Sequence, residues 1–415
     1  MASPDADGLT VPGRIALCTF DLMVLVLILV GILYVYSTGY VGEDWQADSP
    51  WRKQVVWAVL GLATYVFVGK LDCDGLRPLS LPAYLWGILL LVLVLFFGIE
   101  RYGAQRWLSV VGWTVQPSEF AKSATILFLA AWLADRGDRE CGLGTLLAAA
   151  GIALLPFVLI VVEPSLGAAL TLAIPASVMI GVSLLSARWL VVVLAFGTVF
   201  GTLLLCLLFT PGALGLGEES WKGVLKGCGM KDYQITRVES FVNREGWNEL
   251  QSRIGVATGG LTGKGYLQGT QKSLGYLPRT VAPTDFIFTV IAEESGFLGA
   301  CVILCLYAGI VVFVLETAIR TCSPFARRAA IGTAVLLTTH VFVNIGMTIG
   351  LLPVTGLPLP LLSYGGSFMV CTLALLGFVR AAAREAFAGH PPQPPSASAR
   401  PPRRSGHFVQ LQFKF

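Results

Sequence analysis

Long apolar runs constrain this chain more than any other feature of its sequence. A helix needs about 20 apolar residues to cross a bilayer. Charged residues make up only 13% of the 415 residues, against about 25% in soluble domains, and the mean hydropathy is +0.73. These properties predict an all-α, polytopic membrane protein rather than a soluble enzyme. About ten transmembrane helices are expected, at roughly 17–37, 54–70, 78–98, 117–135, 143–163, 166–185, 188–209, 297–318, 329–351 and 361–382.

The charges between the runs predict the orientation. Lys and Arg in short loops accumulate on the cytoplasmic side. Ten spans place both termini on one side, and that side holds eleven short-loop Lys and Arg residues, whereas the other side holds four, Arg52, Lys53, Arg101 and Arg106. We therefore expect both termini in the cytoplasm and one long extracytoplasmic loop, 210–284.

The expected organisation is one membrane domain between two tails. Residues 1–16 form a cytoplasmic N-terminal tail, 17–388 the transmembrane domain, and 389–415 a Pro-, Ser- and Arg-rich cytoplasmic tail that should be disordered. The nine cysteines and three histidines show no zinc spacing. The net charge of +4 gives no reason to expect nucleic-acid binding.

Asp285 is the most unusual ionisable residue, because it stands at the head of the apolar run 286–292 and a carboxylate there is costly to keep. Thr284 or Asp285 could simply cap the following helix. Alternatively, burial raises the pKa of Asp285 above about 3.9 and suits it to act as a general base. The segment 285–318 is too long for a roughly 30 Å core. We expect a break near Gly296 and Gly299 that places Asp285 at the outer mouth of a polar cavity.

Other polar residues gather near the same boundary. Gln116-Pro-Ser-Glu119 predicts a helix start, and Lys122 falls on the same helical face as Glu119. This pair could be an isolated ion pair or, with Arg106, could receive an anionic head group. Lys264 lies in the segment GGLTGKG, which is either ordinary turn chemistry or a phosphate-binding loop.

Five further positions have weaker signals. Glu163 lies between two predicted spans, and Arg237 and Gln251 lie in the long loop, where each could be an ordinary surface residue. His340 is four residues before Asn344 on the ninth span, and an interhelical hydrogen bond is the ordinary explanation for such residues.

Together these motifs resemble the SEDS family of shape, elongation, division and sporulation membrane proteins, over most of the chain. Three short stretches are closer to the rod-shape branch, RodA, than to the division branch, FtsW: Phe120, QGTQ at 268–271 and NIGM at 344–347. Ser165 departs from the family, which usually has Asp there, and Glu163 is a carboxylate that could compensate. The motifs that carry the resemblance are QPSEFAK (116–122), 259–271, TDFIF (284–288), AEE (292–294), NIGM (344–347) and PLPLLSYGG (358–366).

The resemblance implies a peptidoglycan glycosyltransferase of the bacterial inner (plasma) membrane. Such enzymes polymerise lipid II, a disaccharide-pentapeptide on undecaprenyl pyrophosphate, into β-1,4 glycan strands, here during cell elongation and shape maintenance. The family's essential aspartate matches Asp285, which becomes the expected base. Arg106, Lys122 and Lys264 are assigned to the pyrophosphate. Further substrate-binding candidates are Glu119, Glu163, Arg237 and Gln251.

The resemblance also implies partners. They are a class B penicillin-binding protein (a PBP2-like transpeptidase), the elongation machinery and membrane lipids, with no nucleic acid. No cofactor is certain; a divalent cation, Mg²⁺ or Mn²⁺, could help to neutralise the leaving group. Two other functions stay open: a flippase for lipid II, which inverted repeats and charges at mid-bilayer depth would favour, and a non-catalytic scaffold of the cell-wall machinery.

Overall fold

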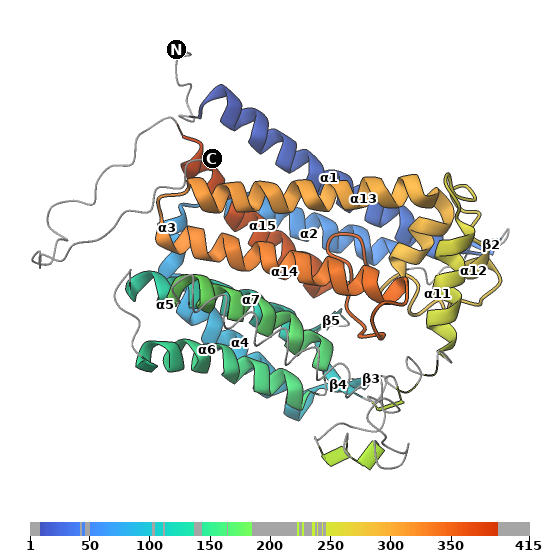
Figure 1. Cartoon of the computed structure of the whole chain (residues 1–415), viewed down its shortest axis with the longest axis horizontal. Helices are drawn as coiled ribbons and strands as arrows, with labels where there is room; N and C mark the ends of the chain where they lie inside the picture. Colours follow the sequence, from blue (N-terminus) through green and yellow to red (C-terminus); the bar gives the residue numbers. More distant parts are fainter. Residues whose placement is uncertain are drawn as a thin grey trace, which may run out of the picture.

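The computed structural model shows a bundle of long helices that run side by side (Figure 1). Seven of the helices that it describes are long and apolar enough to cross a membrane. The expectation of a polytopic helical protein is confirmed. The residues described are 9–41, 44–45, 50–101, 104–110, 113–136, 143–163, 165–184, 222–223, 226–227, 235–236, 239, 243 and 246–388.

Nine of the ten predicted spans correspond to long helices. The remaining one, the seventh span at 188–209, lies outside the described residues. The bounds of these helices differ from the predicted ones by up to six residues, except that α13 begins ten residues before the predicted span 297–318, because it includes the short piece before the break. The long helices are α1 (Val11–Thr38), α2 (Trp51–Lys70), α4 (Ser80–Phe97), α5 (Pro117–Arg136), α6 (Leu143–Val162), α7 (Leu166–Leu184), α13 (Ile287–Arg320), α14 (Pro324–Thr348) and α15 (Gly366–Ala386).

Short elements cap the two ends of the bundle. At one end lie α3 (Cys73–Leu76) and the 3₁₀ turn η1 (Arg77–Leu79). At the other end lie α11 (Trp247–Thr258), α12 (Thr270–Ser273) and two small antiparallel sheets (Figure 1). The sheets, which the sequence did not predict, are β1 (Tyr40–Val41) with β2 (Asp44–Trp45), and β3 (Ile99–Arg101), β4 (Ala104–Val110) and β5 (Trp113–Val115) in the order β3-β4-β5.

The two ends of the described chain meet at the α3 end of the bundle. Leu9 pairs with Ala388 in an antiparallel bridge, and the amide of Thr10 donates to the carbonyl of Phe387 over 3.4 Å. An even number of spans requires such an arrangement. That this end faces the cytoplasm stays a prediction.

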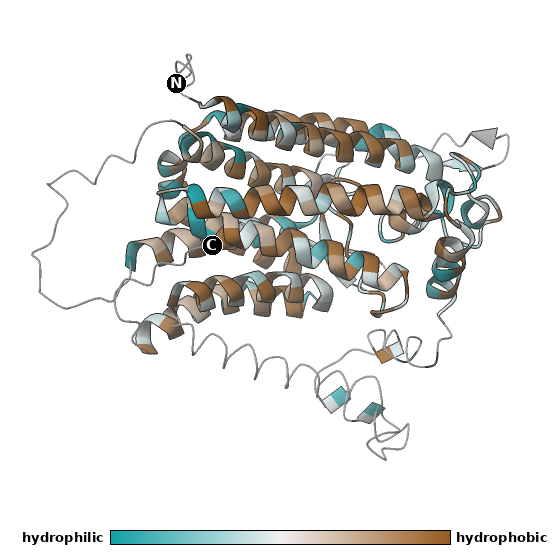
Figure 2. Ribbon diagram, turned by 45° about the horizontal axis from the view of Figure 1, so that its top comes forward, coloured by the Kyte–Doolittle hydropathy of each residue, from teal (hydrophilic) through white to brown (hydrophobic). Residues whose placement is uncertain are grey.

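The outside of the bundle is apolar, as lipid requires. Figure 2 shows hydrophobic residues along the lengths of the helices and hydrophilic ones gathered near the ends. Large apolar side chains such as Leu22 on α1 and Phe96 on α4 are exposed, at 59% and 72%. A soluble monomer rarely exposes apolar patches this extensive.

Inside the bundle, glycines let helices approach closely. A Cβ atom on Gly377 of α15 would lie 2.7 Å from the carbonyl oxygen of Tyr65 on α2, so these two helices pack backbone against backbone. An ion pair joins a third helix to them: Nε and Nη2 of Arg380 donate to Asp21 of α1 at 2.9 and 3.0 Å. The hydroxyl of Tyr65 donates to the same carboxylate.

Helix α13 is broken at Gly296, which has φ 68° and ψ −166°. The predicted break near Gly296 and Gly299 is therefore confirmed. A left-handed φ of this kind is favourable only for glycine. The break divides α13 into a short piece, beginning at Ile287, and a long piece that runs the length of the bundle.

Candidate functional site

Asp285 lies in the tight turn that leads into the short piece of α13. Its amide donates to the carbonyl of Val281 over 3.0 Å, and the amide of Phe286 donates to the same oxygen over 3.1 Å. Phe286 is the N-cap residue of α13, without a side-chain capping bond, so Asp285 does not occupy the N-cap position. The Asp285 side chain is half-buried. The helix that follows it, α13, begins at the end of the bundle that carries α11 and α12 (Figure 1).

The glycine-rich segment 259–265 fills the break in α13. The amides of Lys264 and Gly265 donate to the carbonyls of Glu293 and Glu294, each over 3.0 Å, and the amide of Phe297 donates to Gly260 over 2.9 Å. Backbone groups freed by a helix break at membrane depth must be paired within the protein. These amides therefore serve the helix in this structure, which is the turn-chemistry interpretation of the segment.

The side chain of Lys264 also has acceptors inside the protein. Its Nζ atom lies 2.6 Å from Oε1 of Glu293 and 2.9 and 2.6 Å from the hydroxyls of Thr258 and Thr270. Lys264 remains 24% exposed, whereas Glu293 is 1% exposed. A pyrophosphate contact by Lys264 stays a prediction, and it requires the ammonium to exchange at least one of these partners.

A second ion pair, which the sequence did not predict, stands beside the first. Lys272 pairs with Glu294, and Ser37 at the end of α1 hydrogen-bonds to both. All three side chains are buried. The consecutive acids of the AEE motif and the two lysines that precede them were the available signal. This network fixes the segment between α11 and α13 against α1.

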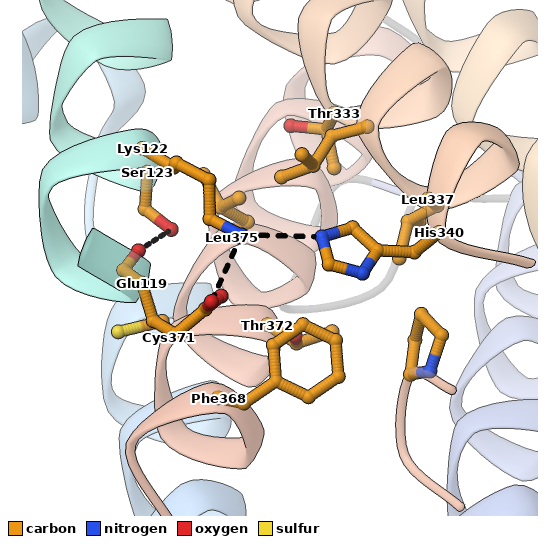
Figure 3. Close-up of a pocket in the computed structure, with 12 residues that line it drawn as sticks. Glu119, Lys122, Ser123, Thr333, Leu337, His340, Phe368, Cys371, Thr372 and Leu375 are labelled. Atoms are coloured by element: carbon orange, nitrogen blue, oxygen red, sulfur yellow. Dashed lines mark hydrogen bonds and ion pairs between the residues drawn. The ribbon is translucent and has the colours of Figure 1, made fainter. Parts of the chain in front are cut away.

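Glu119 and Lys122 form the predicted ion pair at the start of α5 (Figure 3). The distance between Nζ of Lys122 and Oε1 of Glu119 is 2.9 Å. The side chain of Lys122 is only 1% exposed, and that of Glu119 is 5% exposed. Nζ of Lys122 also lies 3.2 Å from the hydroxyl of Thr171 and 3.3 Å from Nε2 of His340. The three N–H groups of the ammonium thus have three acceptors.

The partners of His340 determine its tautomer. An ammonium donates and never accepts, so Nε2 of His340 accepts from Lys122. Nδ1 then carries the proton and donates to the carbonyl of Pro358 over 3.3 Å. The sequence predicted that His340 bonds between helices, and this is confirmed, but it did not predict Lys122 as the partner.

A small pocket lies beside this cluster, between α5, α14 and α15 (Figure 3). Asp285 is not one of its lining residues, so its expected place at a cavity mouth stays a prediction. His340 and Asn344, one turn apart on α14, connect the two regions, because Asn344 contacts the backbone of Asp285. The pocket residues include Glu119, Lys122, Ser123, Thr333, His340, Pro360, Phe368, Cys371 and Thr372.

Glu163 is buried in the turn between α6 and α7, with 1% of its surface exposed. Neither carboxylate oxygen has a hydrogen-bond partner among the residues that the structure describes. Burial raises the pKa of Glu163 to about 8, and the nearby guanidinium of Arg106 opposes this shift. Nε of Arg106, on β4, donates to the backbone carbonyl of Glu163 over 3.2 Å. The structure thus brings Arg106 to Glu163, and burial favours the neutral form of the Glu163 carboxyl.

The remaining candidates are less defined. Gln251 is buried on α11, at 7% exposure. Arg237 lies outside the described residues. Ser165, at the position where the SEDS family usually has Asp, is 5% exposed and two residues from Glu163. Within the described parts of the chain, no group of three His, Cys, Asp or Glu side chains could hold a metal ion.

The comparison with known proteins decides the family. The profile of FTSW_RODA_SPOVE, described as "Cell cycle protein", matches residues 18–387, which is most of the chain. This protein belongs to the FtsW/RodA/SpoVE family. The family assignment confirms the resemblance seen in the motifs and, with the seven apolar helices, identifies a multi-pass membrane protein.

Proteins similar to this FtsW/RodA/SpoVE protein include two peptidoglycan glycosyltransferases and a chain of a solved complex. The peptidoglycan glycosyltransferase MrdB of Escherichia coli (strain K12) is 33% identical, over 87% of this chain and 91% of that protein. The peptidoglycan glycosyltransferase RodA of Treponema pallidum (strain Nichols) is 31% identical, over 87% of this chain and 96% of that protein. A solved structure described as "Structural coordination of polymerization and crosslinking by a peptidoglycan synthase complex" contains a similar chain, with a TM-score of 0.69 and 28% identity. The match covers 89% of this chain and 97% of the solved chain.

Proposed function

We propose that this chain is a peptidoglycan glycosyltransferase that polymerises lipid II into β-1,4 glycan strands. The observation that carries the proposal is the family match over residues 18–387, which includes Asp285 in a turn at the head of the broken helix α13. The names of the relatives MrdB and RodA, both peptidoglycan glycosyltransferases, support the reaction. The proposed role in cell elongation and shape rests on the resemblance of the motifs to the rod-shape branch.

In the proposed reaction, Asp285 is the general base. Its carboxylate takes the proton of the C4 hydroxyl of the acceptor sugar, and that oxygen attacks the anomeric carbon of the donor. The bond from the anomeric carbon to the pyrophosphate oxygen breaks, and undecaprenyl pyrophosphate leaves with the bonding electrons on that oxygen. An α-linked donor becomes a β-linked product, so the displacement inverts the configuration.

The leaving pyrophosphate needs cations, and we assign Arg106, Lys122 and Lys264 to it. Lys264 is the more accessible of the two lysines, with 24% of its side chain exposed against 1% for Lys122. Glu119, Glu163, Gln251 and Arg237 are assigned to the polar groups of the substrate. Glu163 is buried and has no hydrogen-bond partner among the described residues, and its carboxyl in the neutral form, which burial favours, can both donate and accept a hydrogen bond to a hydroxyl or amide group of a sugar.

A divalent cation has no described carboxylate cluster to hold it. Mg²⁺ or Mn²⁺ bound to the pyrophosphate of the donor would supply charge neutralisation.

We further propose that the enzyme works beside a class B penicillin-binding protein, which crosslinks the strands. The solved relative comes from a complex that coordinates polymerization and crosslinking. The exposed apolar faces of the long helices offer a surface for a membrane-spanning partner as well as for lipid.

The test is to assay polymerisation and flipping on the same preparation. Purified protein in vesicles, with and without its transpeptidase partner, receives lipid II on one side. We expect glycan strands on the side where Asp285 lies, with no movement of lipid II across the bilayer. Flipping without polymer would support a transporter, and neither activity, with full binding to the partner, would support a scaffold.

A further inference from the structure

Three consecutive carbonyl groups of the turn that carries Asp285 are held by the C-terminal part of the chain. The carbonyl of Pro283 accepts from the amide of Tyr364 over 2.8 Å. The carbonyl of Thr284 accepts from the hydroxyl of Ser363 over 2.5 Å, and that of Asp285 accepts from Nδ2 of Asn344 over 3.0 Å. The turn's own amides point the other way, into the carbonyl of Val281.

The side chain of Asn344 uses both of its N–H groups to hold backbone carbonyls. It is fully buried on α14, and the two hydrogens of its Nδ2 atom go to two carbonyls, those of Asp285 and of Leu357, the latter over 2.7 Å. Its Oδ1 atom has no partner among the described residues. A buried amide with an unpaired oxygen is unfavourable, so a packing role alone does not explain an asparagine here. The donor function toward two backbone segments does.

Ser363 is held as firmly as the turn that it contacts. It is 1% exposed, its hydroxyl accepts from the amide of Leu359 over 2.7 Å, and its carbonyl accepts from Nε2 of Gln54 on α2 over 3.2 Å. Leu361, within the same segment, has φ 64°, an uncommon conformation for leucine. This segment is therefore fixed by α2 on one side and presents the hydroxyl of Ser363 to Thr284 on the other.

The bonds to Thr284 and Asp285 flank the Cα atom of Asp285. The carbonyl of Thr284 belongs to the peptide plane before this Cα, and the carbonyl of Asp285 belongs to the plane after it. Fixing both planes fixes the direction of the Cα–Cβ bond and hence where the carboxylate can reach. A displacement of about 1 Å at a reacting group can lower a rate about 100-fold.

We propose that Asn344 and Ser363 are positioning residues, which orient the peptide planes on both sides of Asp285 so that its carboxylate reaches the acceptor hydroxyl. This proposal rests on the function proposed above for Asp285. It adds two residues that hydrogen-bond to the backbone of the turn and act on the chemical step through Asp285.

The test separates kcat from KM for lipid II in the purified full-length protein with its transpeptidase partner. Asn344→Asp keeps the shape of the side chain but replaces the donor nitrogen by oxygen, and Ser363→Ala removes the hydroxyl. We expect kcat to fall about 10- to 100-fold in each variant, with KM within about twofold. Ser363→Thr keeps the hydroxyl and should recover most of the lost rate.

The control is Tyr84→Phe. The hydroxyl of Tyr84 on α4 donates to the carbonyl of Ile152 on α6 over 2.9 Å, so this variant also loses a buried bond from a side chain to a backbone carbonyl, but between helices that give no residue to the Asp285 turn. We expect kcat unchanged. Thermal unfolding of every variant, followed in detergent, checks that each is folded.

Asp285→Asn, measured in parallel, makes the two possible failures distinguishable. If Asp285→Asn is inactive while folded Asn344→Asp and Ser363→Ala keep the kcat of the unmodified protein, the positioning proposal is overturned and the base assignment stands. If Asp285→Asn is fully active, the proposed function of Asp285 is overturned first. A rise in KM at constant kcat would also contradict the positioning role, because it would place these residues in substrate binding.

Discussion

Nζ of Lys122 lies 3.3 Å from Nε2 of His340, although the two residues are 218 positions apart in the sequence. With Glu119 and Thr171, His340 completes three acceptors for the three N–H groups of the ammonium. Lys122 is therefore fully paired in this structure. If it binds pyrophosphate, the substrate must replace one of these partners, and Thr171 and His340, the two neutral ones, are the easier to displace.

The buried charges of Glu119 and Lys122 should depend on each other. Lys122→Met leaves the carboxylate of Glu119 buried without its counter-ion, and removal of one partner of a buried pair typically costs about 3–5 kcal/mol. The double variant Glu119→Gln/Lys122→Met removes both charges and should regain most of that stability. Thermal unfolding in detergent measures both. If the single and the double variant lose equal stability, the unpaired carboxylate of Glu119 is not what destabilises Lys122→Met, and the prediction is contradicted.

Glu163 should make the protein less stable as the pH rises. Its pKa is about 8 in the folded protein, against 4.5 for an ordinary glutamate. Between these values the folded state holds a proton that the unfolded state has lost, so stability falls as the pH increases, by at most about 1.4 kcal/mol per pH unit. Glu163→Gln should flatten the dependence of the melting temperature on pH between about 5 and 8.

A matched control for Glu163 is Glu316→Gln, which removes a carboxylate that is 38% exposed and paired with Arg320 at the surface of α13. This variant should keep the pH dependence of the unmodified protein. A slope that is the same in Glu163→Gln and in the unmodified protein would show that Glu163 does not carry the extra proton.

The break in α13 should not tolerate a side chain at Gly296. Alanine there would need φ 68°, and its Cβ atom would lie 2.3 Å from the amide nitrogen of Gly263. We expect Gly296→Ala to destabilise the protein by more than about 2 kcal/mol. Gly151→Ala is the control, because Gly151 is inside α6 with no atom within 4 Å of the added Cβ. Helix propensity should make this variant neutral or slightly more stable.

Lys264 can be tested for substrate contact separately from its structural bond to Glu293. Lys264→Met leaves the buried carboxylate of Glu293 unpaired by an ammonium and should be less stable, whereas Lys264→Met/Glu293→Gln should recover stability. Loss of a charged hydrogen bond to pyrophosphate should raise the KM for lipid II about tenfold in both variants. A KM that recovers together with the melting temperature would assign Lys264 a structural role only.

Local and periodic signals predicted much of this molecule. Apolar run length located the long helices, the excess length of 285–318 with its glycines located the break at Gly296, and the spacing of three residues predicted the pair of Glu119 and Lys122. Each of these three signals depends only on the sequence of one helix and on the lipid or water around it. The three-stranded sheet of β3, β4 and β5 carries no comparable signal, because two of its strands have only three residues, too few for a recognisable alternating pattern.

Contacts between distant segments could not be predicted in the same way. Lys264 pairs with Glu293 across the helix break, and Arg106 reaches the backbone of Glu163 from another element. Asn344 bonds to Asp285 only because the bundle brings α14 against the turn before α13. A single sequence contains the chemistry of these residues but not their pairing.

Asp285 carries the central claim, and polymerisation of lipid II by Asp285→Asn tests it most directly. The variant is purified with its transpeptidase partner, checked for folding by thermal unfolding, and compared with the unmodified protein for the glycan strands it forms. We predict that the folded variant forms no strands, because the amide cannot accept the proton of the acceptor hydroxyl. Strands formed at the rate of the unmodified protein would contradict the account.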